Sequence, residues 1–290
     1  MTQRKAYAIL LAVVVVWAGN FPLSKLGLAE IGPLTVGAAR ALVAVPLLFL
    51  VARAGAPLRW PLRATDYTAF IVLGLTGLVL NTTVWYWGIQ HTTALNAGII
   101  GASAPIFTAV AASLLLRDRL TRRNWAGIGL SVVAVVLTVA QGSLAVLRDL
   151  DVNRGDVIIL LSQASWIVYT LYSRAALSTL PPAWVMAGAH AVSAMILVPL
   201  ALVLEPPWPA PWTAPRGWLV VVYGALPVTL GHLWFYAVVR MVGAGRAATF
   251  MNLMPFVVIT LAWAIAGETV HAYHVVGALL VAAGVYLVTR

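Results

Sequence analysis

The chain has 290 residues, of which 62% are hydrophobic and 9% are charged, and its mean hydropathy is +0.96. A soluble domain of this length needs a charged surface that so few Asp, Glu, Lys and Arg residues cannot provide, so the composition excludes one and makes the bilayer the main solvent. The lack of cysteine excludes disulfides, thiolate metal sites and cysteine nucleophiles.

Ten apolar stretches follow one another from the N-terminus, each close to the roughly 20 residues that cross a bilayer. We place these spans near residues 6–28, 33–52, 67–88, 94–116, 124–142, 155–177, 183–203, 217–239, 243–266 and 271–289. The first follows Arg4 and Lys5 as a signal peptide would, but it is too long for one and contains Trp17 and Lys25, so we interpret it as an uncleaved span. The predicted fold class is an all-α membrane protein with ten transmembrane helices.

The basic residues are distributed unevenly between the loops on the two sides of the membrane. Of the 18 Lys and Arg residues, Lys25 and Arg40 fall within spans, Arg148, Arg154 and Arg216 fall in loops opposite the N-terminus, and the other thirteen fall on the N-terminal side. Because Lys and Arg concentrate in cytoplasmic loops, we predict a bacterial inner-membrane protein with both termini in the cytoplasm. This distribution also explains the net charge of +10 without nucleic acid, so the expected partners are lipid and a small-molecule substrate.

The second half of the chain repeats the first at a nearly constant offset. Tyr86, Pro105 and Asp118 recur 150 positions later as Tyr236, Pro255 and Glu268, and Trp17, Lys25 and Pro33 recur 149 positions later as Trp166, Arg174 and Pro182. Five spans per half make the second repeat enter the membrane from the opposite side, and we place the repeats at residues 1–148 and 149–290. Inverted repeats are typical of transporters that bind their substrate between the repeats near the bilayer centre.

Polar and aromatic side chains follow single helix faces inside several spans. Trp17, Asn20 and Ser24 share one face of the first span, and an equivalent stripe occurs in the sixth. Such faces either hydrogen-bond neighbouring helices or line a cavity, and their recurrence in both repeats favours a cavity. The predicted substrate-binding residues are Trp17, Asn20, Asn81, Trp85, Ser103, Trp166, Tyr169, His232 and Asn252.

Four further residues are candidates for movement rather than binding. Pro105 and Pro255 lie near the middle of spans 4 and 9 and each removes a backbone donor, so they are either paired hinges or static kinks. Tyr86 lies toward the outer end of its span and Tyr236 toward the cytoplasmic end of its own. We predict that the tyrosines form opposite gates, with interfacial anchoring as the alternative.

Charged and catalytic groups are scarce inside the spans. No Asp or Glu falls at mid-span, so we expect uncoupled exit of the substrate, or proton linkage through His232 as the alternative. Arg40 faces either the cavity or a helix C-terminus, and we do not assign it as a ligand. The motifs of zinc proteases and serine hydrolases do not occur, so no enzyme activity, metal site or cofactor is predicted.

Two blocks of sequence resemble a known family. The segment Trp17-Ala-Gly-Asn-Phe-Pro-Leu-Ser-Lys25 is similar to the first span of EamA-type members of the drug/metabolite transporter superfamily. The block from Trp85 to Leu137 resembles the second part of an EamA repeat, and its copy runs from Tyr236 to Leu287. Asp118 departs from the glutamate usual there. The resemblance covers essentially the whole chain and implies ten helices and export of amino acids, related metabolites or drugs.

Together these features predict an exporter of amino acids and similar metabolites that works by alternating access. Within the family the aromatic lining looks most like that of aromatic amino-acid exporters, in which ring faces would contact the substrate and its ammonium group. A multidrug exporter with the same cavity is the first alternative, and an intramembrane enzyme is a remote one.

Overall fold

The ten predicted spans correspond to ten helical crossings, several of which are interrupted. The computed structural model describes residues 3–55, 62–116, 120–149, 151–205 and 208–289. The first half contains α1 (Gln3–Gly27), α2 (Pro33–Ala54), α3 (Ala64–Leu73) with η1 (Gly74–Asn81) and α4 (Thr82–His91), α5 (Ala94–Ala102) with α6 (Ala104–Leu116), and α7 (Arg122–Val139). After the short α8 (Leu144–Arg148), the second contains α9 (Arg154–Thr179), α10 (Pro182–Leu204), α11 (Pro215–Tyr223) with η2 (Gly224–Val228) and α12 (Thr229–Val242), α13 (Ala244–Met251) with α14 (Met254–Ala266), and α15 (Ala272–Thr289).

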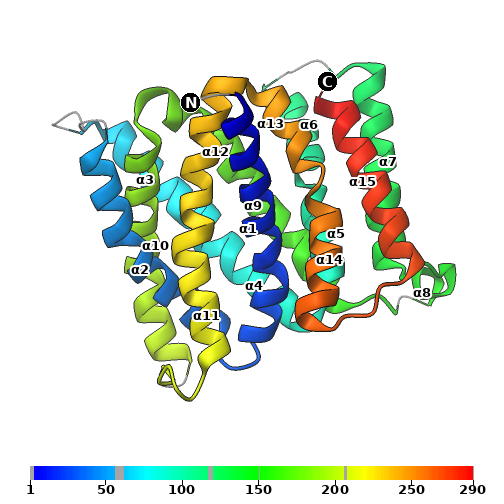
Figure 1. Cartoon of the computed structure of the whole chain (residues 1–290), viewed down its shortest axis with the longest axis horizontal. Coiled ribbons are helices and arrows are strands. Elements are labelled where there is room, and N and C mark those ends of the chain that lie inside the picture. The colour runs from blue at the N-terminus through cyan, green and yellow to red at the C-terminus, as the bar shows by residue number, and fades with distance from the viewer. Residues whose placement is uncertain (1–2, 56–61, 117–119, 150, 206–207, 290) are drawn as a thin grey trace.

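The predicted fold class is confirmed, because all the regular structure in the described residues is helical and arranged as ten crossings. Eight of these helical segments are long and apolar enough to span a membrane by length and composition. The other two, α7 and α15, pack side by side at one edge of the bundle (Figure 1). The chain is therefore a multi-pass membrane protein.

Two kinds of helix interruption occur at equivalent places in the two repeats. A π-helical segment begins at Gly74 in the third crossing and at Gly224 in the eighth, 150 residues apart. The fourth and ninth crossings each break into two helices, and Pro105 and Pro255 are the second residues of the new helices α6 and α14. Proline fits the first turn of a helix because the N–H it lacks has no partner there. The two prolines therefore begin new helices rather than kink continuous ones.

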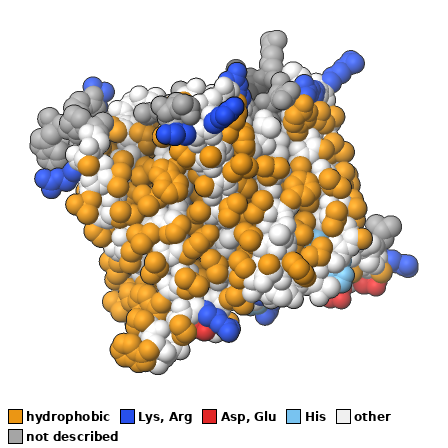
Figure 2. Space-filling model, in the orientation of Figure 1, with side chains coloured by type: hydrophobic (Ala, Val, Ile, Leu, Met, Phe, Trp, Pro, Cys, Tyr) orange, Lys and Arg blue, Asp and Glu red, His pale blue; other side chains and the backbone are white. Residues whose placement is uncertain are grey.

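The chain termini lie at the same end of the bundle, which we call the terminal face (Figure 1). The opposite end, which carries α8, is called the distal face. Apolar side chains cover the band between these faces, as expected of a surface in contact with lipid (Figure 2). Lys and Arg gather along the terminal face, whereas the Asp and Glu side chains visible in this view lie at the distal face.

The edge pair α7 and α15 depends on small residues at its contact. A Cβ atom added at Gly127 would lie 2.5 Å from the backbone oxygen of Gly284, so the two helices approach more closely than side chains would permit. Such close backbone contact is a common basis of helix association in membranes, where burial from water cannot drive it.

We expect the Gly127→Ala substitution to destabilise the protein by about 1–3 kcal/mol, because the new methyl group must push α15 away. Gly129→Ala is the matched control, since a Cβ there meets no atom within 4 Å. Its effect should be neutral or slightly stabilising because alanine favours helix more than glycine. Melting temperatures of the purified variants in detergent test this, and equal values for both would contradict the close contact.

Candidate functional site

A cavity of about 630 Å³ lies between the two repeats. Its walls come from α1, α2, η1, α4 and the break between α5 and α6 in the first half, and from α9, α10, η2, α12, the break between α13 and α14, and α15 in the second. Both kinds of helix interruption therefore face the cavity. With the exception of Ser103, the wall includes every predicted binding, gating and hinge residue: Trp17, Asn20, Asn81, Trp85, Tyr86, Pro105, Trp166, Tyr169, His232, Tyr236, Asn252 and Pro255.

Aromatic rings form two panels on the cavity wall. On the α1 side, Trp17 packs against His232 and Phe235, with ring centroids 4.6 and 5.5 Å apart. On the α9 side, the rings of Trp166 and Tyr169 stack with centroids 5.0 Å apart. Tyr169 in turn lies directly over Gly77 of η1, where any side chain would collide with its ring. The panels provide flat apolar surfaces on which a ring or an alkyl chain can pack.

Several polar groups on the wall bond to helix carbonyls. The Val228 carbonyl, at the end of η2, accepts from Trp17 Nε1 at 3.3 Å and from His232 Nδ1 at 2.8 Å. Asn81 Nδ2 donates to the Ser162 carbonyl at 2.8 Å. The carbonyl at the end of η2 thus orients Trp17 and His232, and a carbonyl of α9 orients Asn81.

Other polar atoms on the wall are buried without a hydrogen-bond partner among the described residues. They are Asn20 Oδ1, Thr170 Oγ1, His190 Nε2 and Asn252 Oδ1. Buried polar atoms in proteins are nearly always paired, so these four are the groups best suited to bind a polar ligand.

The expectation that Ser103 faces a ligand is wrong. Its side chain is buried, and its Oγ donates to the Ile100 carbonyl at 2.6 Å. The hydroxyl therefore completes the end of α5, where backbone carbonyls lose their helical partners. Its neighbours Ala102 and Ala104 line the cavity, whereas the side chain of Ser103 does not.

Some cavity residues were not assigned from the sequence. Gln163 and Thr170 lie on the same face of α9 as Trp166, at i−3 and i+4, so helical spacing could have identified them. His190 occurs 150 positions after Arg40, and both line the cavity, so the repeat offset also carried a signal.

The charge on the wall is one-sided. Arg40 and Arg174 line the cavity, whereas no Asp or Glu does so within the described part of the chain. Arg40 Nη1 donates to the hydroxyl of Tyr86 at 3.1 Å.

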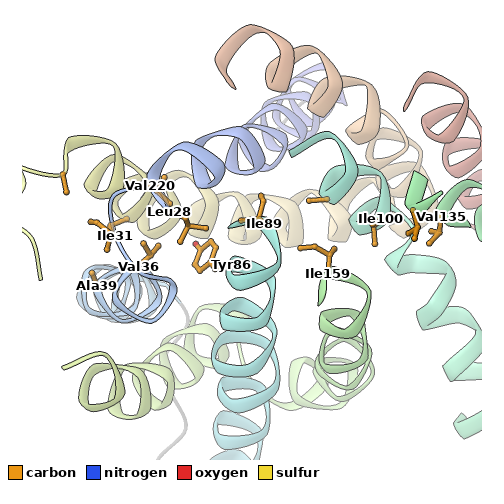
Figure 3. Close-up of a cluster of buried hydrophobic side chains, with 14 residues drawn as sticks. Leu28, Ile31, Val36, Ala39, Tyr86, Ile89, Ile100, Val135, Ile159 and Val220 are labelled. Carbon is orange, nitrogen blue, oxygen red and sulfur yellow. The ribbon is translucent and has the colours of Figure 1, made fainter. Parts of the chain in front are cut away.

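A hydrophobic cluster closes the distal end of the cavity. Its members come from the distal parts of both repeats and include Leu28, Ile89, Ile159 and Val220 around the fully buried ring of Tyr86 (Figure 3). Beside the cluster, Lys25 ties α1 to the end of α4, because its Nζ donates to the carbonyls of Ile89 and Gln90 at 3.0 and 3.1 Å.

Three carboxylates at the distal face connect the two repeats, because each accepts hydrogen bonds from the N-terminus of a helix in the other repeat. Glu205 accepts from the amides of Leu34 and Thr35 at the start of α2 at 2.9 and 2.8 Å. Glu268 accepts from two amides at the start of α5, and Glu30 from two at the start of α11. A carboxylate there pairs free N–H groups and complements the helix dipole. Asp118, the repeat equivalent of Glu268, lies outside the described residues.

Asp156 is buried in the first turn of α9. It accepts hydrogen bonds from the Thr92 hydroxyl and from Asn96 Nδ2, the latter at 2.9 Å. Asn96 Oδ1 lies 3.1 Å from His274 Nε2, so this polar chain joins α5, α9 and α15 near the distal face.

Toward the terminal face the cavity stays open. Its lining extends to Arg174 and Leu177, within the last two turns of α9, and to Val285 near the end of α15. Arg174 is exposed, and Tyr236 is half-buried and in hydrogen-bonding contact with Tyr169. The structure is therefore closed at the distal face and open at the terminal face.

Residues 4–140 and 153–290 each match the EamA-like transporter family. The chain belongs to this family. A relative from Streptantibioticus cattleyicolor, named "Probable terminal-alkyne amino-acid exporter", is 30% identical over all of this chain and 95% of its own. A second, from Salmonella typhimurium, named "Probable amino-acid metabolite efflux pump", is 25% identical over 98% of this chain and 95% of its own. A solved structure titled "Crystal structure of protein" shares the fold, with a TM-score of 0.67 at 19% identity over 99% of this chain and 98% of its own.

We expect Trp166→Ala to reduce transport at least about tenfold, because it removes half of the stacked panel on α9 while leaving the distal closure intact. Trp263→Ala is the matched control, since this tryptophan is 64% exposed on the outer surface of α14. Initial rates in proteoliposomes, normalised to folded protein, are the measurement. Equal rates for the two variants would remove Trp166 from the site.

Proposed function

We propose that the protein exports amino acids, including aromatic or other neutral ones, and related small metabolites by alternating access. The observation that carries the proposal is the cavity between inverted repeats, closed at one face by contacts between the repeats and open at the other. A relative named as an amino-acid exporter supports the choice of substrate. Belonging to a transporter family argues against the enzymatic alternative.

In this proposal the two aromatic panels hold the apolar part of the substrate. Asn20 and Asn252, whose buried side-chain oxygens lack partners, orient its polar groups. Asn81, Trp85 and His232 complete the wall. The cavity volume of about 630 Å³ is within the usual range for small-molecule sites and exceeds the size of one amino acid.

We assign the terminal face to the cytoplasm and the distal face to the outside of a bacterial inner membrane. The support is the concentration of Lys and Arg on the terminal side. The cavity then faces its substrate supply, as a resting exporter requires. Residues 1–148 and 149–290 remain our proposed boundaries of the two repeats that rock against each other.

Tyr86 and Tyr236 are proposed as opposite gates. Both line the cavity, but Tyr86 is fully buried in the distal cluster, whereas its repeat equivalent Tyr236 is half-buried. In the outward-open state these environments would exchange, and the helix breaks at Pro105 and Pro255 would take up the backbone change.

Flux measured with the purified protein in liposomes tests the function directly. We expect efflux of a radiolabelled aromatic amino acid from these liposomes without an imposed proton gradient. Liposomes without the protein should show no such efflux. Competition by hydrophobic drugs but not by amino acids would favour the multidrug alternative. Chemical conversion of the substrate without flux would favour an enzyme.

The gates can be tested in the natural cysteine-free background with a single Thr82→Cys substitution on the cavity wall. An impermeant maleimide applied to intact cells should label it weakly, because the distal face is closed. Adding Tyr86→Ala should increase labelling several-fold, and adding Tyr236→Ala should not. Strong labelling without either gate substitution would reverse the assigned orientation, and equal effects of the two would refute opposite gates.

A further inference from the structure

We propose that the cavity recognises its substrate through a carboxylate group bound by Arg40, and that it selects apolar and aromatic carboxylates over amines and lipophilic cations. The inference rests on the proposed function only in taking the cavity ligand to be the transported molecule. It names the chemical group that the site requires.

The position of Arg40 on α2 is fixed by contacts from two other elements. Its Nη1 donates to the Tyr86 hydroxyl on α4 at 3.1 Å. Its Cδ and Nε lie so close to Gly224 on η2 that an added Cβ would be 2.9 and 3.0 Å from them. The guanidinium is thus held over the first residue of the π-helical segment, on the cavity wall.

Arg40 has no carboxylate partner among the described residues. It donates to the hydroxyl of Tyr86, and electrostatic interactions link it to His190 on α10 and His232 on α12. Each histidine donates Nδ1 to a backbone carbonyl of its own helix, Met186 or Val228. A partly buried guanidinium without a counter-charge is costly within a membrane, and a ligand carboxylate would supply that charge.

The geometry of arginine suits this role. A guanidinium has five N–H donors in one plane, and the bond to Tyr86 uses one of them. The remaining N–H groups can donate to both oxygens of a carboxylate, and such bidentate pairs are among the strong charge-assisted hydrogen bonds. The carboxylate would lie beside the Tyr86 hydroxyl, where the cavity meets the distal closure.

An amine is a poorer ligand for the same wall. Arg40 and Arg174 would repel it, and no described carboxylate on the wall attracts it. Attraction of a cation to aromatic rings is weaker than charge repulsion at similar distance in a poorly hydrated cavity. The ammonium–aromatic contact expected from the sequence is therefore secondary. The ammonium of an amino acid would instead meet the unpaired oxygens of Asn20 and Asn252.

Three probes of nearly equal shape separate the two charges. They are L-phenylalanine, 3-phenylpropionate, which lacks the amine, and 2-phenylethylamine, which lacks the carboxylate. Binding to the purified protein is followed by intrinsic tryptophan fluorescence, with tetraphenylphosphonium as the lipophilic cation. We expect L-phenylalanine and 3-phenylpropionate to bind at least about tenfold more tightly than either cation.

Arg40→Gln should weaken the binding of L-phenylalanine and 3-phenylpropionate about tenfold or more. It should leave the binding of 2-phenylethylamine unchanged or make it tighter. Arg40→Lys should retain only part of the affinity, because it keeps the charge but not the planar donors. Arg53→Gln is the matched control, since Arg53 lies on the same helix, is exposed and does not line the cavity. If Arg40→Gln does not fold, the probe series on the unsubstituted protein decides alone.

The outcomes separate this inference from the proposed export. Tight binding of 2-phenylethylamine, or no binding of either carboxylate, overturns the role of Arg40 even if liposomes show amino-acid flux. Binding of 3-phenylpropionate that depends on Arg40, in a protein that moves no amino acid, upholds the role of Arg40 and refutes the proposed substrate of transport. Equal losses of carboxylate affinity in Arg40→Gln and Arg53→Gln would also overturn the role of Arg40.

Discussion

Within a bilayer the polar backbone groups of a broken helix have no water to pair with, and this constraint organises the whole structure. Two of the helix interruptions show how such groups are paired. The π-helical carbonyl of Val228 accepts from Trp17 and His232, and the break at Ser103 is closed by the serine hydroxyl itself. The helix N-termini at the distal face receive carboxylates from the opposite repeat. The same need for hydrogen-bond partners therefore places the helix breaks at the cavity and fastens the two repeats together.

The repeats are related in sequence, but their equivalent side chains lie in different environments. Tyr86 is fully buried and bonded to Arg40, whereas Tyr236 is half-buried and in contact with Tyr169. One sequence relationship thus yields two environments in a single conformation, which is the asymmetry that alternating access requires. The hydrophobic cluster at the distal face, and the carboxylates of Glu30, Glu205 and Glu268 bound to helix N-termini there, account for which end is closed.

Charge on the cavity wall is as informative as shape. Apolar panels alone would accept hydrophobic compounds of many kinds, because dispersion contacts discriminate weakly. The guanidinium of Arg40, without an acidic partner in the described chain, adds a requirement that shape does not provide. Recognition of a carboxylate next to Tyr86 would also place the ligand against the element that closes the distal face.

The sequence by itself determined the ten helices, the inverted repeat and most of the cavity wall. The reason is that the bilayer requires a long apolar stretch in each spanning helix and makes polar groups that face lipid costly. Trp17, Trp166 and His232 could be found from helical spacing and repeat offset alone. Only the tertiary structure decided that Ser103 faces its own helix, that Asp156 is buried, and that Arg40 lines the cavity. These facts depend on where a helix breaks and what packs against it across the repeats. Such contacts join residues far apart in the chain, and local periodicity does not record them.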